Sequence, residues 1–479
     1  MGNKPNLAKN ALLNTVKQCC AILFPLITFP YVSRVIGTEN YGKITFGNSI
    51  ISYITMVATL GIAQYSIREG AKKRDNKKEL NETVNEIFTI NMLSTVVAFI
   101  IFAVLMVLWP KLAGYRVLLL VQVSSVLFVT LGTDWINSIF EDYRILTIRY
   151  IVFHGISIFF MFLFVRKEED YIIYAAICVL AAIIPNILNI FYVRKNYGIR
   201  LKLVKPTEAK KHLKPIMILF ASSIASFIYV NSDVTILGIF KDDNEVGLYG
   251  AAAKIYTLVK KVIDAFLFVA IPKVSSELAK GLKEKANQQL NSVLKVLISF
   301  VLPICTGMFL LSQNIVLLIS GDKFAGAETS LSILAVSLVF SALAIFYVSL
   351  VLIPLGKEKI ILIATIVSAV ANIVLNFILI PFWGRDAAAL TTVISEVIMV
   401  VYGIIYSVKD YKFNIVRALI SGIVASLGVA GLYFGTSFMG LGSVVQLFVC
   451  IAGAAVWYLL VMAVINKEDL KALVKTFKK

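Results

Sequence analysis

Apolar runs of about twenty residues recur along the whole chain, separated by short polar segments that carry most of its charge. A helix rises about 1.5 Å per residue, so a run of this length crosses roughly 30 Å of hydrocarbon. The pattern predicts an all-α polytopic membrane protein with fourteen spans and no soluble domain. The expected limits of the spans are 18–36, 44–67, 86–109, 117–140, 146–165, 171–193, 215–239, 247–271, 291–312, 327–354, 360–380, 386–407, 415–436 and 443–465.

The basic residues alternate from one connecting segment to the next. If the N-terminus lies in the cytoplasm, 33 of the 46 Lys and Arg residues fall in inner segments, 8 in outer loops and 5 within spans. Cytoplasmic loops of membrane proteins carry such an excess, so both termini are expected to be cytoplasmic. The same bias accounts for the net charge of +18, and no nucleic-acid partner is expected.

Composition supports the membrane assignment. The chain is 59% hydrophobic and only 15% charged, with a mean hydropathy of +0.85, whereas soluble chains are about 25% charged. The five cysteines lie in apolar segments and form no CxxC or Cys/His cluster. The sequence therefore predicts no disulfide framework, metal centre built on cysteine, or bound cofactor. No cleavable signal is expected at the N-terminus, so the first span is expected to stay.

An internal repeat indicates two related halves. The turn before the second span, Gly37–Gly47, resembles the turn before the eighth, Asp242–Ala252, and Gly42 aligns with Gly247. Six spans separate the two turns, so both units run in the same direction and predict two parallel six-helix lobes. A fold of paired lobes is expected to hold its pathway in a central cavity. The expected parts are an N-terminal lobe (1–200), a C-terminal lobe (201–410), and two further spans with a basic tail (411–479).

The eighth span carries charge inside an apolar run. Lys254 and Lys261 are two turns apart on one helix face, and Lys260 stands four residues before Asp264, with which it can pair. Because charge is costly in a bilayer, the Lys254/Lys261 face is predicted to line a wet cavity and bind an anionic ligand. Purely structural pairing, or snorkelling to the interface, is the alternative. Lys260, and Arg34 of the first span, are further candidate ligands for the anion, and Arg34 has an interfacial anchor as its alternative role.

A second polar group offers oxygen ligands. Asp233 in the seventh span, Asn376 in the eleventh and Thr392 in the twelfth lie at matching depth, with Asn372 of the eleventh span and Glu396 of the twelfth slightly lower. Carboxylate, amide and hydroxyl oxygens suit a hard cation such as Na⁺, so these residues predict a sodium site if the three spans touch. Hydrogen bonding between helices is the alternative.

Two other features each admit two interpretations. Asp134 and His154 form either a proton relay, with H⁺ as the coupling ion, or two separately satisfied side chains. The tail Asn466–Lys479 is either a basic amphipathic helix on anionic lipids or a solvated tail.

Several stretches resemble the polysaccharide repeat-unit flippases, which translocate O-antigen, capsule and exopolysaccharide precursors. These flippases belong to the multidrug/oligosaccharidyl-lipid/polysaccharide exporter superfamily. In the first half the stretches are PLITFPYVSRVIGTENYGKITFGNSIISY (Pro25–Tyr53) and GIAQYSIREGAKKRD (Gly61–Asp75). In the second half they are LYGAAAKIY (Leu248–Tyr256), PLGKEKIILIATIVSAVANIVLNFILIPFWG (Pro354–Gly384) and AAALTTVISE (Ala387–Glu396). The resemblance covers the first twelve spans.

The resemblance implies a V-shaped bundle with a cationic cavity lined by spans 1, 2, 7 and 8. It implies a bacterial cytoplasmic-membrane protein that moves undecaprenyl-pyrophosphate-linked oligosaccharide from the inner to the outer leaflet. Lys254 matches a basic cavity residue of related flippases, and Asp233, Asn372, Asn376 and Thr392 match a sodium site of the lipid II flippases. Two departures are the count of fourteen spans, where repeat-unit flippases usually have twelve, and Arg385-Asp386 in place of a glycine-rich turn.

The expected function is thus an ion-coupled flippase working by alternating access, with a polysaccharide polymerase and glycosyltransferases as partners. A lipid II-type flippase for another lipid-linked precursor, and a cation-coupled drug exporter of the same superfamily, are the alternatives. The lysines of the eighth span argue against the exporter, whose ligands are cations. A membrane polymerase or glycosyltransferase is excluded because the outer loops are too short to hold a catalytic site.

Overall fold

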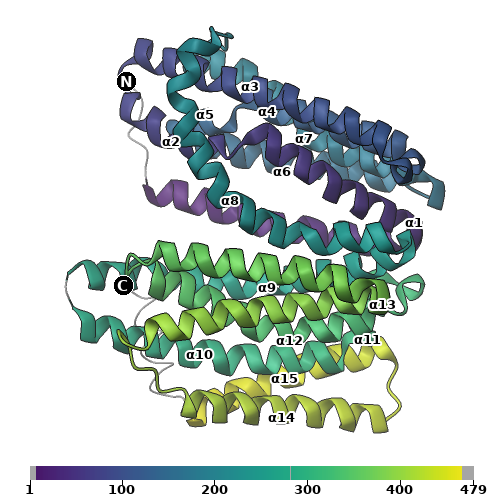
Figure 1. Cartoon of the computed structure of the whole chain (residues 1–479). Coiled ribbons are helices and arrows are strands. Elements are labelled where there is room, and N and C mark those ends of the chain that lie inside the picture. The colour runs from purple at the N-terminus through teal and green to yellow at the C-terminus, as the bar shows by residue number, and fades with distance from the viewer. Residues whose placement is uncertain (1–6, 281, 466–479) are drawn as a thin grey trace. The chain divides into compact units, whose positions relative to one another are not determined.

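The computed structural model describes residues 7–280 and 282–465, and every regular element within these ranges is helical (Figure 1). This confirms the predicted all-α class. The α-helices are α1 (Leu7–Thr59), α2 (Ile62–Lys73), α3 (Lys77–Leu108), α4 (Arg116–Gly132), α5 (Asp134–Ile139), α6 (Tyr143–Phe164), α7 (Tyr171–Asn196), α8 (Pro206–Phe240), α9 (Asp243–Ala279), α10 (Lys283–Leu310), α11 (Ser312–Ser320), α12 (Ala327–Ile345), α13 (Glu358–Ser407), α14 (Val416–Phe438) and α15 (Ser443–Ile465).

The predicted spans correspond to these helices. In the described part of the chain, 11 helices are long and apolar enough to cross a membrane. Two of them, which contain α1 and α13, are kinked at a glycine and comprise two predicted spans each. The 37-residue helix α9 supplies the charged eighth span. Counted in this way, the described helices account for all fourteen predicted spans, so the protein is a multi-pass membrane protein.

Single glycines make the two kinks. Gly37 in α1 has φ 74° and ψ 177°, and Gly384 in α13 has φ 57° and ψ −134°. Side chains with a Cβ rarely adopt these angles, whereas glycine reaches them without strain. The helix resumes directly after Gly37, so the predicted outer turn over 37–47 is confined to one residue.

Helices extend beyond the predicted spans on the predicted cytoplasmic side. The helix α3 begins at Lys77, where the Asn76 side chain accepts a 3.2 Å hydrogen bond from the backbone N–H of Glu79 and caps the first turn. The helix α8 begins at Pro206 and therefore takes in the end of the basic segment that was expected to be a loop. Charged residues at the starts of these helices made the apolar pattern appear shorter than the helices are.

The chain divides into two compact units, Met1–Asn231 and Ser232–Lys479. In the first unit α1 packs on α3, α4 and α6, and α7 packs on α4 and α6. In the second unit α12 packs on α9, α10 and α13, while α14 packs on α10 and α15. The helix α8 begins in the first unit and ends in the second. The predicted lobe boundaries and the predicted cavity stay predictions.

The first unit has an apolar cluster where α2, α3, α5 and the start of α8 meet. Ile62, Leu80, Ile87, Ile136 and Ile216 are all nearly inaccessible in it. Burial of such side chains is the main favourable term that holds these helices together. This cluster fixes the start of α8 against α2 and α3.

Two hydrogen bonds join Asp142, the residue before α6, to the end of α7. The hydroxyls of Tyr192 and Tyr197 donate hydrogen bonds of 2.6 and 2.8 Å to Oδ2 of Asp142. Burial, and then the hydrogen bond to the Asp142 carboxylate, raise the pKa of Tyr197 well above its usual range. The hydroxyl therefore stays protonated and remains a donor. The tail from 466 to 479, for which two interpretations were open, lies outside the described residues.

Candidate functional site

The charged residues of α9 have different surroundings. Lys260 donates a 2.9 Å hydrogen bond to Oε1 of Glu396 on α13 and lies 5.9 Å from the centre of the Tyr256 ring. Lys254 is half-buried and Lys261 is exposed. The structure thus gives Lys260 a charged partner from another helix, and leaves the role of the Lys254/Lys261 face as a prediction.

The expected partner of Lys260 within its own helix is Asp264, but the structure places the ammonium on Glu396 instead. Asp264 is half-buried, and its Oδ1 has no hydrogen-bond partner among the described residues. A contact between helices therefore takes the place of the predicted contact four residues along α9. Glu396 is buried, and an unpaired buried carboxylate would be more costly than an unpaired half-buried one.

Arg34 is exposed on α1. Its Nη1 donates a 2.7 Å hydrogen bond to the carbonyl oxygen of Pro30 in the same helix. A guanidinium carries five N–H donors, so one contact with a backbone carbonyl does not decide between an anion ligand and an interfacial anchor. Both interpretations of Arg34 therefore stand.

The residues of the predicted sodium site meet in the second unit. Oδ1 of Asp233 accepts a 2.7 Å hydrogen bond from the Asn376 amide, and Oδ2 accepts one of 2.7 Å from the Thr392 hydroxyl. The Asn376 amide also lies 3.1 Å from Oδ1 of Asn372. Asp233, Asn372 and Asn376 are all buried. The matched depths expected from the sequence therefore do correspond to contact between α8 and the two halves of α13.

Three residues that the sequence interpretation missed complete this cluster. The Tyr249 hydroxyl of α9 donates a 2.9 Å hydrogen bond to Oδ2 of Asp233. The Ser232 and Thr391 hydroxyls donate hydrogen bonds of 2.6 Å to the amide oxygens of Asn372 and Asn376. Small hydroxyls and a tyrosine inside apolar runs are easily taken for core residues. The spacing of these three residues in the sequence did not mark them as part of a polar cluster.

The chemistry of the cluster suits a small hard cation. It offers one carboxylate, two amide oxygens and several hydroxyl oxygens, which Na⁺ accepts as ligands. Each amide oxygen already accepts a hydroxyl hydrogen, so a cation here requires those hydroxyls to turn. The described residues form no group of three or more His, Cys, Asp or Glu side chains that could hold a metal ion, so the ligands offered here are mainly amide and hydroxyl oxygens. Ion binding by this cluster stays a prediction.

Asp134 and His154 do not contact each other in the structure. Oδ1 of Asp134 accepts a 2.7 Å hydrogen bond from Nη2 of Arg149, which is buried. Nδ1 of His154 lies 3.0 Å from the carbonyl oxygen of Tyr150, and the His154 ring stacks on Tyr150 and Phe24. Each predicted relay residue therefore has its own partners, which supports the interpretation of a satisfied histidine.

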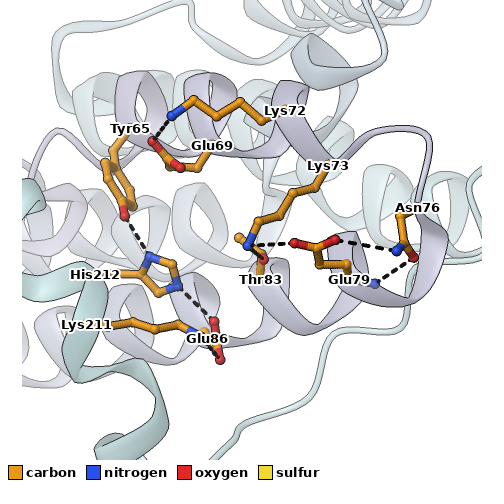
Figure 2. A network of polar contacts seen from close by, with 10 residues as sticks. All are labelled: Tyr65, Glu69, Lys72, Lys73, Asn76, Glu79, Thr83, Glu86, Lys211 and His212. Atoms are coloured by element: carbon orange, nitrogen blue, oxygen red, sulfur yellow. Dashed lines mark hydrogen bonds and ion pairs between the residues drawn. The ribbon is translucent and has the colours of Figure 1, made fainter.

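The other histidine lies in a hydrogen-bonded network that includes charged side chains. His212 of α8 lies between Tyr65 of α2 and Glu86 of α3, and Lys211 binds the same carboxylate (Figure 2). His212 was missed because it falls in the basic segment that was expected to be a cytoplasmic loop.

Comparison with known proteins gives the family. Residues 7–278, more than half of the chain, match the family model described as polysaccharide biosynthesis protein, and residues 216–378 match the MatE model. A protein named "Putative O-antigen transporter" from Escherichia coli K12 is 24% identical over 58% of this chain. The chain spans 66% of the length of that relative. A protein of the same name from Shigella dysenteriae is 20% identical over 74% of this chain and 88% of its own.

Solved structures show the same fold. The lipid II flippase MurJ in its inward closed conformation matches with a TM-score of 0.73 at 18% identity, over 96% of this chain and 99% of the other. An inward-facing multidrug resistance MATE family transporter of the MOP superfamily matches with a TM-score of 0.63 at 15% identity, over 81% and 93%. With the match over residues 7–278, which is more than half of its length, the chain belongs to the polysaccharide biosynthesis protein family.

Proposed function

We propose that the protein is a flippase that carries lipid-linked oligosaccharide across a membrane. The observation that carries the proposal is the family match over residues 7–278, and two relatives with O-antigen transporter names support it. The many spanning helices fit a substrate whose polar head cannot cross hydrocarbon unaided, since burying charged groups without partners is costly.

The finer proposal names the substrate as an undecaprenyl-pyrophosphate-linked repeat unit. A pyrophosphate head is anionic, and Lys254 and Lys261 are two turns apart on one face of α9. Lys260 is neutralised by Glu396, so this pair contributes little attraction for an anion. The head is held in a hydrated cavity while the polyprenyl tail remains in the bilayer, and alternating access exposes the head to the other side.

Ion coupling is the second part of the proposal. The Asp233 cluster joins three helices of the second unit through one carboxylate, so a bound cation changes the contacts among α8, α9 and α13 together. A site that holds its ion in only one conformation biases the conformational equilibrium. An inward gradient of Na⁺ or H⁺ then resets the carrier after each release of substrate.

The proposed setting is a bacterial cytoplasmic membrane, with both termini in the cytoplasm. The alternating distribution of Lys and Arg along the sequence supports this orientation. Glycosyltransferases that build the repeat unit supply the substrate, and a polymerase on the outer side consumes the product. Anionic lipids are the expected neighbours of the basic inner segments.

The test is the double variant Lys254→Ala/Lys261→Ala, measured by flipping of a lipid-linked oligosaccharide in proteoliposomes and by surface polysaccharide in cells. We expect flipping to fall at least about tenfold, because each lost charge weakens the hold on the pyrophosphate. Lys359→Ala is the control, since Lys359 is an exposed lysine in the first turns of α13. Full activity of the double variant would remove these lysines from the mechanism.

Drug export is a second candidate, favoured by the match of residues 216–378 to the MatE model. A deletion strain that expresses the chain separates the two functions. Increased resistance to cationic drugs with unchanged surface polysaccharide supports export, whereas accumulation of lipid-linked repeat units in the deletion strain supports the flippase. The two lysines on one face of α9 favour the flippase, because they would repel a cationic drug.

A further inference from the structure

The His212 ring is buried at the start of α8 between two oxygen atoms from different helices (Figure 2). Its Nε2 lies 2.8 Å from Oε2 of Glu86 on α3, and its Nδ1 lies 2.7 Å from the hydroxyl oxygen of Tyr65 on α2. Both ring nitrogens therefore have hydrogen-bond partners. All three residues belong to the first compact unit.

The chemistry of the two partners allows the ring to take up a proton without losing either contact. An ionised carboxylate only accepts hydrogen bonds, so Nε2 carries hydrogen toward Glu86. In the neutral ring Nδ1 then accepts the hydrogen of the Tyr65 hydroxyl. When Nδ1 gains a proton it donates to the same oxygen, and the tyrosine hydroxyl turns its own hydrogen away. The Tyr65 hydroxyl therefore donates a hydrogen bond to the neutral ring and accepts one from the protonated ring, without a change in the distance between the two atoms.

The charges around the ring come from all three helices. On α8, Nζ of Lys211 lies 2.7 Å from Oε1 of Glu86. On α2, the Arg68 guanidinium lies 5.6 Å from the centre of the Tyr65 ring, and Glu69 binds Lys72 at 2.9 Å. Glu86 is the acidic group in direct contact with the imidazole.

These charges determine how protonation of His212 changes the contact between α8 and α3. With a neutral ring, Lys211 balances Glu86. A proton on His212 adds a second positive charge beside the same carboxylate. The Nε2 contact, in which only the acceptor is charged when the ring is neutral, then becomes an ion pair in which both partners are charged. The contact between α8 and α3 is therefore stronger at low pH and weaker as the pH rises.

The segment just before α8 is also attached to α3. The backbone N–H groups of Arg200, Lys202 and Val204 donate hydrogen bonds of 3.3, 2.9 and 3.0 Å to Asn81, Asn85 and Thr89 respectively. The three acceptors follow one another along α3 at intervals of one helical turn. They therefore form a row that holds the non-helical segment before α8. His212 extends this attachment into α8 itself, and α8 carries Asp233 at its other end.

We propose that His212, with Glu86 and Tyr65, forms a proton-binding site that controls how firmly the start of α8 is attached to α2 and α3. Proton uptake tightens the attachment, and proton release loosens it. Any consequence for transport rests on the proposed flippase function, but proton binding and attachment do not depend on it.

The first experiment measures the proton directly. The chain has two histidines, so the His154→Gln protein labelled with ¹⁵N-histidine reports only on His212. We expect its ring nitrogen shifts in detergent micelles to change with pH. In Glu86→Gln the midpoint of this change should move to lower pH, because the carboxylate that favours the cation is gone. A ring whose shifts do not change with pH, or a midpoint that Glu86→Gln leaves in place, overturns the proposal.

The second experiment measures the attachment by amide hydrogen exchange in residues 199–216, corrected for the intrinsic effect of pH. The wild-type protein and His154→Gln are expected to exchange roughly fivefold more slowly near pH 6 than near pH 8, since opening this segment breaks the strengthened bond. In His212→Gln this difference is expected to vanish, and in Tyr65→Phe it is expected to shrink. A difference that persists in His212→Gln overturns the proposal. Flipping measured on the same samples is a separate readout, so a failed flippase assay would leave both results standing.

Discussion

Thr392 of α13 donates a 2.7 Å hydrogen bond to the carboxylate of Asp233 on α8, 159 positions earlier in the chain. Asn376 and Tyr249 donate to the same carboxylate from the other half of α13 and from α9. One buried acidic group therefore connects three helices of the second unit. Its three protein donors stabilise a carboxylate in a setting where an isolated charge would be costly.

If the Asp233 cluster binds sodium, Na⁺ should stabilise the purified protein against heat. A ligand at ten times its dissociation constant stabilises the folded state by about 1.4 kcal/mol. We expect the Tm to be higher in NaCl than in choline chloride at equal ionic strength, and the difference to disappear in Asp233→Asn. Differential scanning fluorimetry in detergent measures both.

The asparagine variant keeps the size of the side chain and removes the charge, so a lost sodium effect is attributable to the charge. Lys359→Ala serves as the matched control and should retain the full sodium effect. A sodium effect of equal size in Asp233→Asn would place the ion elsewhere.

The pair of Lys260 and Glu396 predicts unequal effects of single and double substitution. Glu396→Gln leaves the ammonium without its counter-charge and should lower the free energy of unfolding by on the order of 2–3 kcal/mol. This is below the range for fully buried pairs because the Lys260 side chain is 26% exposed. Lys260→Met combined with Glu396→Met should recover part of the loss, since both charges are then removed. Thermal unfolding of Lys260→Met, Glu396→Met and the double variant measures the coupling, and additive losses would show that the two side chains act independently.

The sequence predicted the spans well because apolar length is a local property. Each of the fourteen predicted spans has a described helix, and the turn expected to begin at Gly37 is where α1 bends. It also placed Asp233 and Asn376 at matching depth, because depth along a helix can be counted from its ends, and the two side chains are in contact in the structure. That their helices touch was a condition of this prediction and not part of it.

Partners across helices could not be predicted in the same way. Spacing four residues apart favours Lys260 with Asp264, but Glu396 comes from α13 and depends on how α9 and α13 pack. His212 stands in a run of basic residues without apolar periodicity, and becomes a buried side chain only because α2 and α3 cover it. Tertiary packing, which a single sequence does not display, decides both cases.

The kink in α13 predicts a strong effect at Gly384. The backbone angles there are unfavourable for a residue with a Cβ, and a Cβ would stand 2.5 Å from Oε2 of Glu245. Glu245 also accepts hydrogen bonds from Arg385, so it cannot move away freely. Gly384→Ala should therefore lower the free energy of unfolding by about 1–3 kcal/mol or more.

Gly435→Ala in α14 is the control for Gly384→Ala, because a Cβ at Gly435 meets nothing within 4 Å. Alanine is favoured over glycine within a helix by up to about 1 kcal/mol, so this variant should be neutral or more stable. Equal losses in the two variants would show that the kink is not what constrains Gly384.

Substitutions of Arg149 and His154, both on α6, distinguish an ion pair between Arg149 and Asp134 from a proton relay between Asp134 and His154. Arg149 donates hydrogen bonds of 2.7 Å to Asp134 and to the carbonyl oxygen of Pro185, so it ties the start of α5 to α7. Arg149→Met should lower the free energy of unfolding by about 1–2 kcal/mol, a value discounted because the Asp134 side chain is 52% exposed. His154→Gln should stay within about 1 kcal/mol of wild type, since the ring has no charged partner: it bonds to the Tyr150 carbonyl in α6 and stacks on Tyr150 and on Phe24 of α1. The pH dependence of transport should also be unchanged in His154→Gln. Transport that becomes insensitive to pH in His154→Gln, with Arg149→Met retaining wild-type stability, would instead support a relay through Asp134 and His154.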